Sequence, residues 1–241
     1  MEGCSLGHIL SNFLEMITHE VEGAENSSPI LDSLVGIYRN ISFSDPLSPY
    51  VYRFELDDES TSHAIKTFKQ SLDCQGVGGM ARLNSPITYL LDELICNIQQ
   101  HANTDHGYAY VGFDKSSNFI EIVIADCGIT IYGSYAFAQK YIELIGNSDA
   151  LALNLARNGY STKNLPDAEN RGYGISSNIQ MVVEGLHGEF AVLSGNALLV
   201  QLENMKKILS LPKEIDFKGT MVIVRFPASI PDDFNLYNYT N

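Results

Sequence analysis

Basic residues are scarce in this chain of 241 residues, in which 15 Lys and Arg stand against 29 Asp and Glu, giving a formal net charge of −14. Binding to the phosphate backbone of nucleic acids depends on clustered Lys and Arg, so the composition argues against a nucleic-acid partner. It favours a soluble protein that a basic surface, or a nucleotide carried with its magnesium, could approach. The sequence has no run of basic residues that would indicate binding to a membrane surface or import into the nucleus.

Cysteine is also scarce, and the four cysteines (Cys4, Cys74, Cys96 and Cys127) form no CxxC pair. This spacing argues against a zinc site and favours a reducing compartment. The chain has no window with the apolar length of a membrane span, and its first residues lack the positively charged segment of a signal peptide. We therefore expect a cytoplasmic protein with no membrane association.

Hydrophobic periodicity predicts the order of helices and strands. Helices are expected over residues 7–22, 60–73, 86–103, 134–146, 148–158 and 174–186. Strands are expected over residues 50–56, 108–114, 118–125, 188–194, 197–203 and 221–226. A flexible joint at 75–79 and a polar loop at 159–171 separate some of them, and a poorly packed tail runs from 229 to 241. This order predicts an α/β (α+β) two-layer sandwich, with a mostly antiparallel mixed sheet and helices on one face.

The helix expected around residues 90–102 has a distinct polar stripe. Glu93, Asn97 and Gln100 recur at i, i+4 and i+7 with His101 on their flank, opposite an apolar side that would face a core. The stripe combines a carboxylate that can take a proton with a carboxamide oxygen that can hold a hard cation, as nucleotide chemistry requires. A solvated helix face is the alternative, and the Glu-x-x-x-Asn spacing alone favours that alternative.

Two further motifs lie at strand ends. An apolar run over 122–125 leads into Asp126, and Gly128 lets the backbone turn tightly there. A carboxylate at this point can accept a hydrogen bond from an exocyclic amine such as that of adenine. Thr220 enters the last expected strand, where its hydroxyl could bridge to a buried carboxylate. An ordinary turn aspartate and plain β-propensity explain the two patterns equally well when each is taken alone.

Glycines and basic residues precede the helix expected at 174–186. Gly172 and Gly174 would let backbone amides approach an anion, where the helix dipole favours negative charge. Lys163 and Arg171 could add charge-assisted contacts to phosphate oxygens. The alternative is a simple helix-entry turn, and the segment is not a Walker P-loop because GxxxxGK[ST] is absent.

In their order along the chain, these motifs resemble those of the GHKL superfamily, which includes gyrase-type and heat-shock-chaperone ATPases, histidine kinases and anti-sigma-factor serine kinases. The resemblance covers roughly residues 80–227 and implies the Bergerat fold. Glu93-x-x-x-Asn97 with His101 is similar to the N box of the family, Asp126-x-Gly128 to its adenine box, Ser161-Thr162-Lys163 to its TTK segment, Arg171-Gly172-x-Gly174-Ile175 to its second glycine box, and Gly219-Thr220 to its terminal Gly-Thr.

The resemblance implies a site for ATP and Mg²⁺. Asp126 would bind the adenine amine with support from Thr220. Asn97 would coordinate Mg²⁺, and Glu93 would orient and deprotonate the attacking water or partner hydroxyl. The remaining nucleotide contacts would come from His101, Gly128, Thr130, Lys163, Arg171, Gly172 and Gly174.

The chain also departs from the family pattern. Thr130 stands where the adenine box usually has its second glycine, which could narrow the approach of the backbone to the nucleotide. Residues 1–79 carry no convincing phospho-acceptor histidine box, and no second domain follows Pro227 to supply the phosphate-contacting lysine of gyrase-type ATPases. These departures argue against a sensor kinase and against a topoisomerase-type motor.

We therefore expect a regulatory Mg-ATP-binding protein of signal transduction, similar to the anti-sigma-factor serine kinases, that hydrolyses ATP or phosphorylates a partner protein. The alternative is a non-catalytic ATP-binding module whose lid presents a surface to a partner, and a third reading treats the motifs as coincidence. We divide the chain into an N-terminal extension (1–79), which either joins the main core or forms a docking element, an ATP-binding domain (80–227) and a polar tail (228–241). A homodimer is one candidate assembly.

Overall fold

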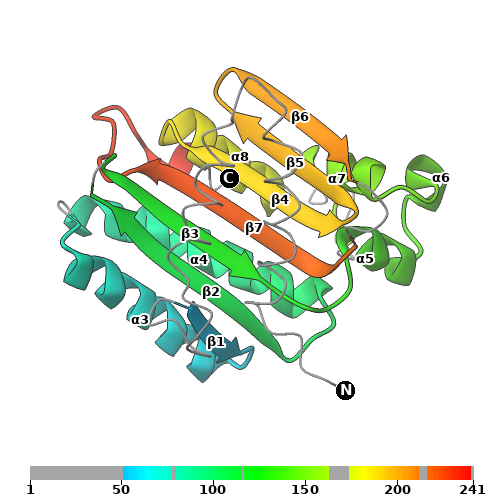
Figure 1. The fold of residues 1–241 in the computed structure, drawn as a ribbon, viewed down its shortest axis with the longest axis horizontal. Coiled ribbons are helices and arrows are strands. Elements are labelled where there is room, and N and C mark those ends of the chain that lie inside the picture. The colour runs from blue at the N-terminus through cyan, green and yellow to red at the C-terminus, as the bar shows by residue number, and fades with distance from the viewer. Residues whose placement is uncertain (1–50, 78–79, 116, 163–173, 212–215, 240–241) are drawn as a thin grey trace.

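A seven-stranded sheet organises the molecule, and its strands follow the order β1-β2-β3-β7-β4-β5-β6 (Figure 1). The computed structural model describes residues 51–77, 80–115, 117–162, 174–211 and 216–239. The strands are β1 (Val51–Glu55), β2 (His106–Asp114), β3 (Phe119–Ala125), β4 (Glu189–Gly195), β5 (Ala197–Leu202), β6 (Met205–Ser210) and β7 (Phe217–Pro227). The expected α/β class is confirmed. The expected mixed sheet is not found, since each pairing of these strands is antiparallel.

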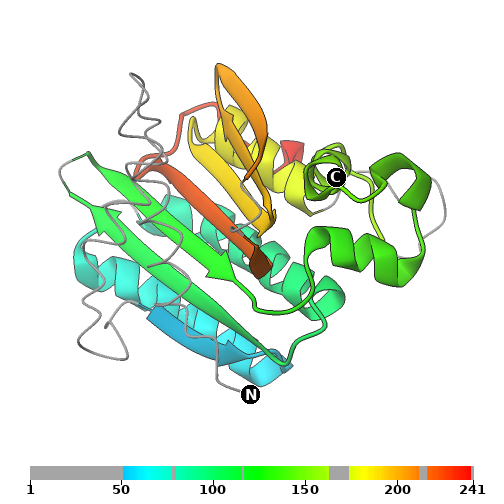
Figure 2. The ribbon, with the colours of Figure 1, turned by 45° about the vertical axis from the view of Figure 1, so that its right-hand side comes forward.

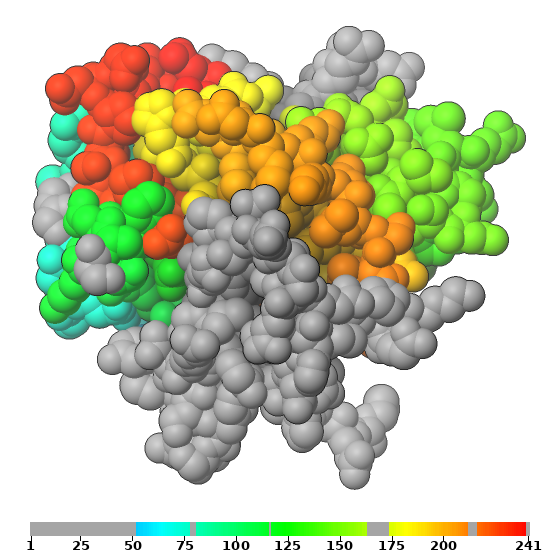
Figure 3. Space-filling view, turned by 45° about the horizontal axis from the view of Figure 1, so that its top comes forward, coloured from blue at the N-terminus to red at the C-terminus, as the bar shows by residue number. Residues whose placement is uncertain are grey.

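Helices α3 (Asp58–Gln75), α4 (Met80–His101) and α8 (Ile175–Ile179) lie on one face of the sheet, and α8 continues as the π-helix η1 (Gln180–Gly185) (Figure 1). Helices α5 (Ile131–Ala138), α6 (Ile142–Ile145) and α7 (Asp149–Arg157) group at one end of the sheet (Figure 2). The β5–β6 hairpin lies beside α7 at the surface (Figure 3). No helix in the described residues is long and apolar enough to cross a bilayer.

Helix α3 shows how the sequence sets these elements. Asp57 begins it by accepting a hydrogen bond from the Ser60 amide at 2.9 Å, and Gly76 ends it in the left-handed conformation with φ 85°. Ala64, Phe68 and Leu72, spaced four residues apart, are buried. Their stripe packs into the same core as the inward side chains of α4 and of the strands. Residues 51–75 thus share their core and their sheet with the residues that follow.

Several elements differ from the prediction. Helix α4 begins at Met80, so Pro86 lies within it instead of starting it. The single helix expected over 134–146 is two helices, because Gln139 and Tyr141 adopt left-handed backbone angles with φ 54° and 58°. Strand β6 was not predicted; it pairs with β5 at the edge of the sheet.

The polar tail is better packed than expected over its described part. The ring of Phe234 stacks on that of Tyr239 with centroids 5.8 Å apart. Tyr239 lies so close to Gly185 that a Cβ on this glycine would be 2.8 Å from the tyrosine ring. The tail is therefore anchored against η1. The helix expected at residues 7–22 lies outside the described residues.

Candidate functional site

A cavity opens where α4, the start of α5, the segment after α7 and the first residue of α8 meet the ends of β3 and β7. It encloses about 820 Å³ of space, a figure that includes open solvent at its mouth. The predicted site residues that line it are Asn97, His101, Asp126, Thr130, Gly174 and Thr220. Side chains that the sequence had placed in separate motifs thus surround one space.

The other predicted site residues are not among the described residues that line the cavity. Gly128 and Glu93 do not line the cavity within the described part of the chain. Lys163, Arg171 and Gly172 lie outside the described residues.

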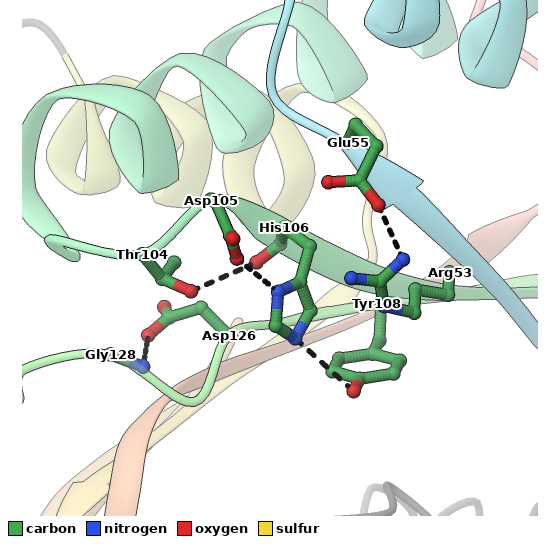
Figure 4. Close-up of polar contacts among 8 residues, drawn as sticks. All are labelled: Arg53, Glu55, Thr104, Asp105, His106, Tyr108, Asp126 and Gly128. Carbon is green, nitrogen blue, oxygen red and sulfur yellow. Dashed lines mark hydrogen bonds and ion pairs between the residues drawn. The ribbon is translucent and has the colours of Figure 1, made fainter. Parts of the chain in front are cut away.

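Asp126 is the buried carboxyl group of the cavity, with 3% of its surface exposed at the end of β3. Its Oδ1 accepts a hydrogen bond from the Gly128 amide at 2.9 Å (Figure 4). Burial raises the pKa of Asp126 to about 7, and hydrogen bonds from the Gly128 and Thr220 amides oppose that rise only in part. Near neutral pH this carboxyl can therefore either accept or donate a hydrogen bond to a ligand.

Two glycines bring backbone segments close around Asp126. A Cβ at Gly128 would lie 1.9 Å from the carbonyl oxygen of Ala102, which also accepts a hydrogen bond from the Ile129 amide at 2.7 Å. A Cβ at Gly219, where φ is +118°, would lie 2.1 Å from the carbonyl oxygen of Asp126. Gly128 therefore lets the segment after β3 pack closely against the end of α4. This contact explains why Gly128 lies outside the cavity lining.

Thr130 begins helix α5. Its hydroxyl accepts a hydrogen bond from the Gly133 amide at 2.9 Å, and its φ of −69° is an ordinary extended value. The backbone at this position therefore does not need glycine, and the hydroxyl satisfies an amide at the helix start. Capping explains the threonine at this position, where the resemblance implied a glycine.

Ser194 connects elements beside the cavity, and the sequence did not indicate it. The residue is 1% exposed, and its hydroxyl accepts a hydrogen bond from the Ile131 amide at 2.9 Å and donates one to the Gly219 carbonyl at 3.1 Å. The hydroxyl of Thr220 lies 3.1 Å from that of Ser194. Thr220 therefore supports Asp126 through its backbone, and its hydroxyl contacts Ser194. A bridge from this hydroxyl to the carboxylate through water stays a prediction. The one signal in the sequence is a polar residue that ends the apolar run of β4.

The segment after α7 is held across the cavity by hydrogen bonds. The Tyr135 hydroxyl donates to the carbonyl of Tyr160 at 2.6 Å. The hydroxyl of Thr162 lies 2.9 Å from Nδ1 of His101 and 3.2 Å from the Ser134 hydroxyl. Burial raises the pKa of Tyr135, so its phenol stays protonated as a donor. Sequence reasoning had not singled out Tyr135 and Tyr160, whose rings give this side of the cavity an aromatic wall.

Asn97 is the candidate cation ligand. Its Nδ2 is buried and has no hydrogen-bond partner in the described part of the chain. Its Oδ1 would lie 3.4 Å from a Cβ at Gly174, which shows that α8 begins against this amide. The described residues contain no group of three or more His, Cys, Asp or Glu side chains that could hold a metal. The carboxamide oxygen of Asn97 is an oxygen donor of the kind that Mg²⁺ takes, and phosphate oxygens and water would have to supply the rest of the shell.

A second polar cluster lies outside the cavity, at the β1–β2 edge (Figure 4). His106 Nδ1 lies 2.5 Å from the Asp105 carboxylate. On the neighbouring strand β1, Arg53 forms an ion pair with Glu55. The hydrogen bond to His106 lowers the pKa of Asp105. The side chain of Asp105 is largely exposed, so this cluster belongs to the surface of the sheet edge and not to the cavity.

Comparison of the chain with protein-family models, with curated proteins and with solved structures found no match in any of the three.

Proposed function

We propose that the cavity binds ATP with Mg²⁺ and that the molecule is a regulatory nucleotide-binding protein with the Bergerat fold of the GHKL superfamily. One observation carries this proposal. Asn97 of α4, Asp126 after β3, Gly174 before α8 and Thr220 of β7 are far apart in the sequence but line the same cavity. These are the positions at which the motif order implied cation, adenine and phosphate contacts.

The lining suits a nucleobase. Ile129, Ile131 and Val222 are among its apolar residues, and Tyr135 and Tyr160 add aromatic surface. Asp126 is the buried polar group among them. A flat heterocycle gains free energy by leaving water for such walls, and an exocyclic amine would satisfy the carboxylate of Asp126. Asn97 would then hold Mg²⁺ at the phosphate side, where the cation neutralises phosphate charge.

A non-catalytic binding module is the second candidate, and the position of Glu93 favours it. Glu93 lies one turn before Asn97 on α4 but does not line the cavity. The N box implies that this carboxylate acts as the general base of an ATPase or a Ser/Thr kinase. A general base has to come within hydrogen-bond reach of the proton that it takes. A measurement of ATP turnover therefore distinguishes an enzyme from a binding module. In such a module the nucleotide only orders a surface for a protein partner.

Titration calorimetry with ATP, in Mg²⁺ and in EDTA, tests the binding site. Wild type is expected to bind ATP and to bind it more tightly with Mg²⁺. Asn97→Ala should lose the gain from Mg²⁺, roughly tenfold or more in Kd, because one contact to a charged group is removed. Gln100→Ala is the matched control, since Gln100 is an exposed amide on the same helix and bonds to Cys96. Equal Mg²⁺-dependent binding by wild type and Asn97→Ala would overturn the assignment of Asn97.

Phosphate release from the same proteins tests catalysis. If Glu93 is the general base, Glu93→Gln abolishes turnover and leaves the Kd for ATP unchanged. If wild type binds MgATP without releasing phosphate or phosphorylating a protein, the molecule is a binding module. If wild type does not bind ATP at millimolar nucleotide, the proposed function itself is wrong.

A further inference from the structure

The sheet has a second face, opposite to the one on which α3, α4 and α8 lie. In Figure 1 this face is turned toward the viewer, with no described helix over it. An antiparallel sheet with one face in water alternates apolar and polar residues along its strands. The central strands instead carry continuous apolar runs, over 122–125 of β3, 190–193 of β4 and 221–224 of β7. Their sequence therefore indicates a sheet that is covered on both faces.

Two rows of apolar side chains cross the second face from strand to strand. The strand register aligns Tyr110, Val123, Ile223, Ala191 and Val200 in the first row, and Ala125, Met221, Leu193 and Leu198 in the second. All of these residues are only 0–7% exposed. None of them belongs to the core that the other face of the sheet shares with α3 and α4. Their burial therefore needs a cover of its own.

The two edges of the second face are exposed. On β1, the side chains of Arg53 and Glu55 are each 48% exposed. On β6, Lys207 and Leu209 continue the two rows, and both are exposed. A place in the sheet is therefore not enough to bury a side chain on this face. The cover extends over β2, β3, β7, β4 and β5 and stops at the edge strands.

Residues 1–50 are the segment of this chain that fits such a cover. They join the described part at Val51, which lies opposite Tyr110 in the register of β1 and β2, at the end of the first row. The chain therefore leaves the sheet beside the buried side chains. The next longest range outside the described residues, 163–173, is much shorter and mostly polar.

Two stretches within residues 1–50 carry apolar side chains at helical spacing, with a polar break at 24–29 between them. These side chains are Leu10, Phe13, Leu14, Ile17 and Val21 in the first stretch, and Leu31, Leu34, Val35 and Tyr38 in the second. Five neighbouring strands span about 19 Å. Two helices side by side are about 20 Å wide. Two amphipathic helices therefore match the width of the buried part of the second face.

We propose that residues 1–50 cover the second face of the sheet with two amphipathic helices, so that the sheet lies between two helical layers. This inference goes beyond the proposed function, because it does not involve the nucleotide. The segment is then part of the fold and not a free docking element for a partner protein. A second copy of the chain is the competing cover, and the experiments distinguish the two.

Two buried methionines provide a test with an internal control. Met221 lies in the second row, whereas Met181 lies in the core on the helical face, and both are 0% exposed. Hydrogen peroxide converts accessible methionine to its sulfoxide, and mass spectrometry measures the rate at each position. In wild type, both should oxidise far more slowly than Met205, which is partly exposed on β6. Protection of Met221 that is lost on dilution would overturn the proposal, because a second copy would then be the cover.

Phe13→Asp combined with Ile17→Asp places two charges on the apolar side of the stretch 7–22 in the full chain. Oxidation of Met221 should then rise about tenfold or more, because the cover opens locally. Met181 should stay protected, since its core lies on the other face. Unchanged protection of Met221 would overturn the proposal.

Asn12→Asp combined with His19→Asp is the matched control. It adds the same two charges on the opposite side of the same stretch. Met221 should oxidise in this variant as slowly as in wild type. Fast oxidation of Met221 here would overturn the proposal, because added charge alone would then account for the effect.

A crosslinking experiment decides the question if the charged variant unfolds and both methionines oxidise together. The photoreactive residue p-benzoylphenylalanine replaces Tyr110, whose side chain lies on the second face. Irradiation of the folded protein should join position 110 to residues 1–50 of the same chain. Crosslinks between two chains, or crosslinks that reach none of residues 1–50, would overturn the proposal.

Discussion

At the scale of single residues, Asp126 shows how burial sets the charge of a side chain in the candidate site. Its pKa is raised to about 7 by desolvation, although two backbone amides donate to it. In the unfolded chain the same group ionises near pH 4. Between these two values the folded protein binds a proton that the unfolded chain does not. The stability of the fold should therefore fall as pH rises from about 4 to about 7 on account of this residue.

Asp126→Asn removes this titration. We expect wild type to gain about 2–3 kcal/mol relative to the variant when the pH is lowered from 8 to 5, since the proton is then bound in the folded state alone. Urea denaturation at several pH values measures this difference. Asp232→Asn, a fully exposed change, is the control and should show little pH-dependent difference. A constant difference between wild type and Asp126→Asn would contradict the raised pKa.

The sequence indicated some residues in and beside the cavity and not others, for physical reasons. Asp126 and Gly174 stand at the ends of regular elements. There a short sequence motif indicates both where the element ends and how the backbone turns. Ser194 and Tyr135 contribute through contacts with residues more than twenty positions away. No local pattern encodes such contacts.

At the scale of elements, Thr130 caps the start of helix α5. If capping is its role, Thr130→Ala should destabilise the protein by about 1 kcal/mol, while Thr130→Gly should cost only a few tenths. Thr130→Ser keeps the hydroxyl and should match wild type. Chemical denaturation followed by circular dichroism would measure all three variants. Equal losses in the alanine and serine variants would show that the hydroxyl bond to the Gly133 amide does not stabilise α5.

Element boundaries were predicted best where periodicity is long. Helices α3 and α4 carry apolar residues at helical spacing over several turns, so their existence was predictable. The break between α5 and α6 depends on left-handed angles at Gln139 and Tyr141, neither of which is a glycine. Strand β6 contains Lys206 and Lys207, which interrupt the apolar pattern but are tolerated at the edge of a sheet.

At the scale of the whole molecule, the candidate site depends on a core that extends beyond the residues lining the cavity. Phe68 of α3 is 0% exposed and meets Tyr52 and Phe54 of β1, with ring centroids 5.3 and 6.2 Å away. This aromatic group belongs to the same core as α4, which carries Asn97. We therefore expect residues 51–75 to unfold together with the residues that line the cavity, across the boundary that the sequence suggested at residue 79.

Phe68→Ala tests this cooperativity. Loss of a buried phenyl ring should cost about 3–5 kcal/mol and should lower the thermal midpoint of the whole protein in one transition. The chain has no tryptophan and 13 tyrosines, so tyrosine fluorescence reports on tertiary structure while circular dichroism reports on the helices. Phe137→Ala is the matched control, because that ring is 81% exposed and its removal should change stability by less than about 0.5 kcal/mol. Two separate transitions in Phe68→Ala, with the later one at the wild-type midpoint, would show that β1 and α3 form a unit on which the cavity does not depend.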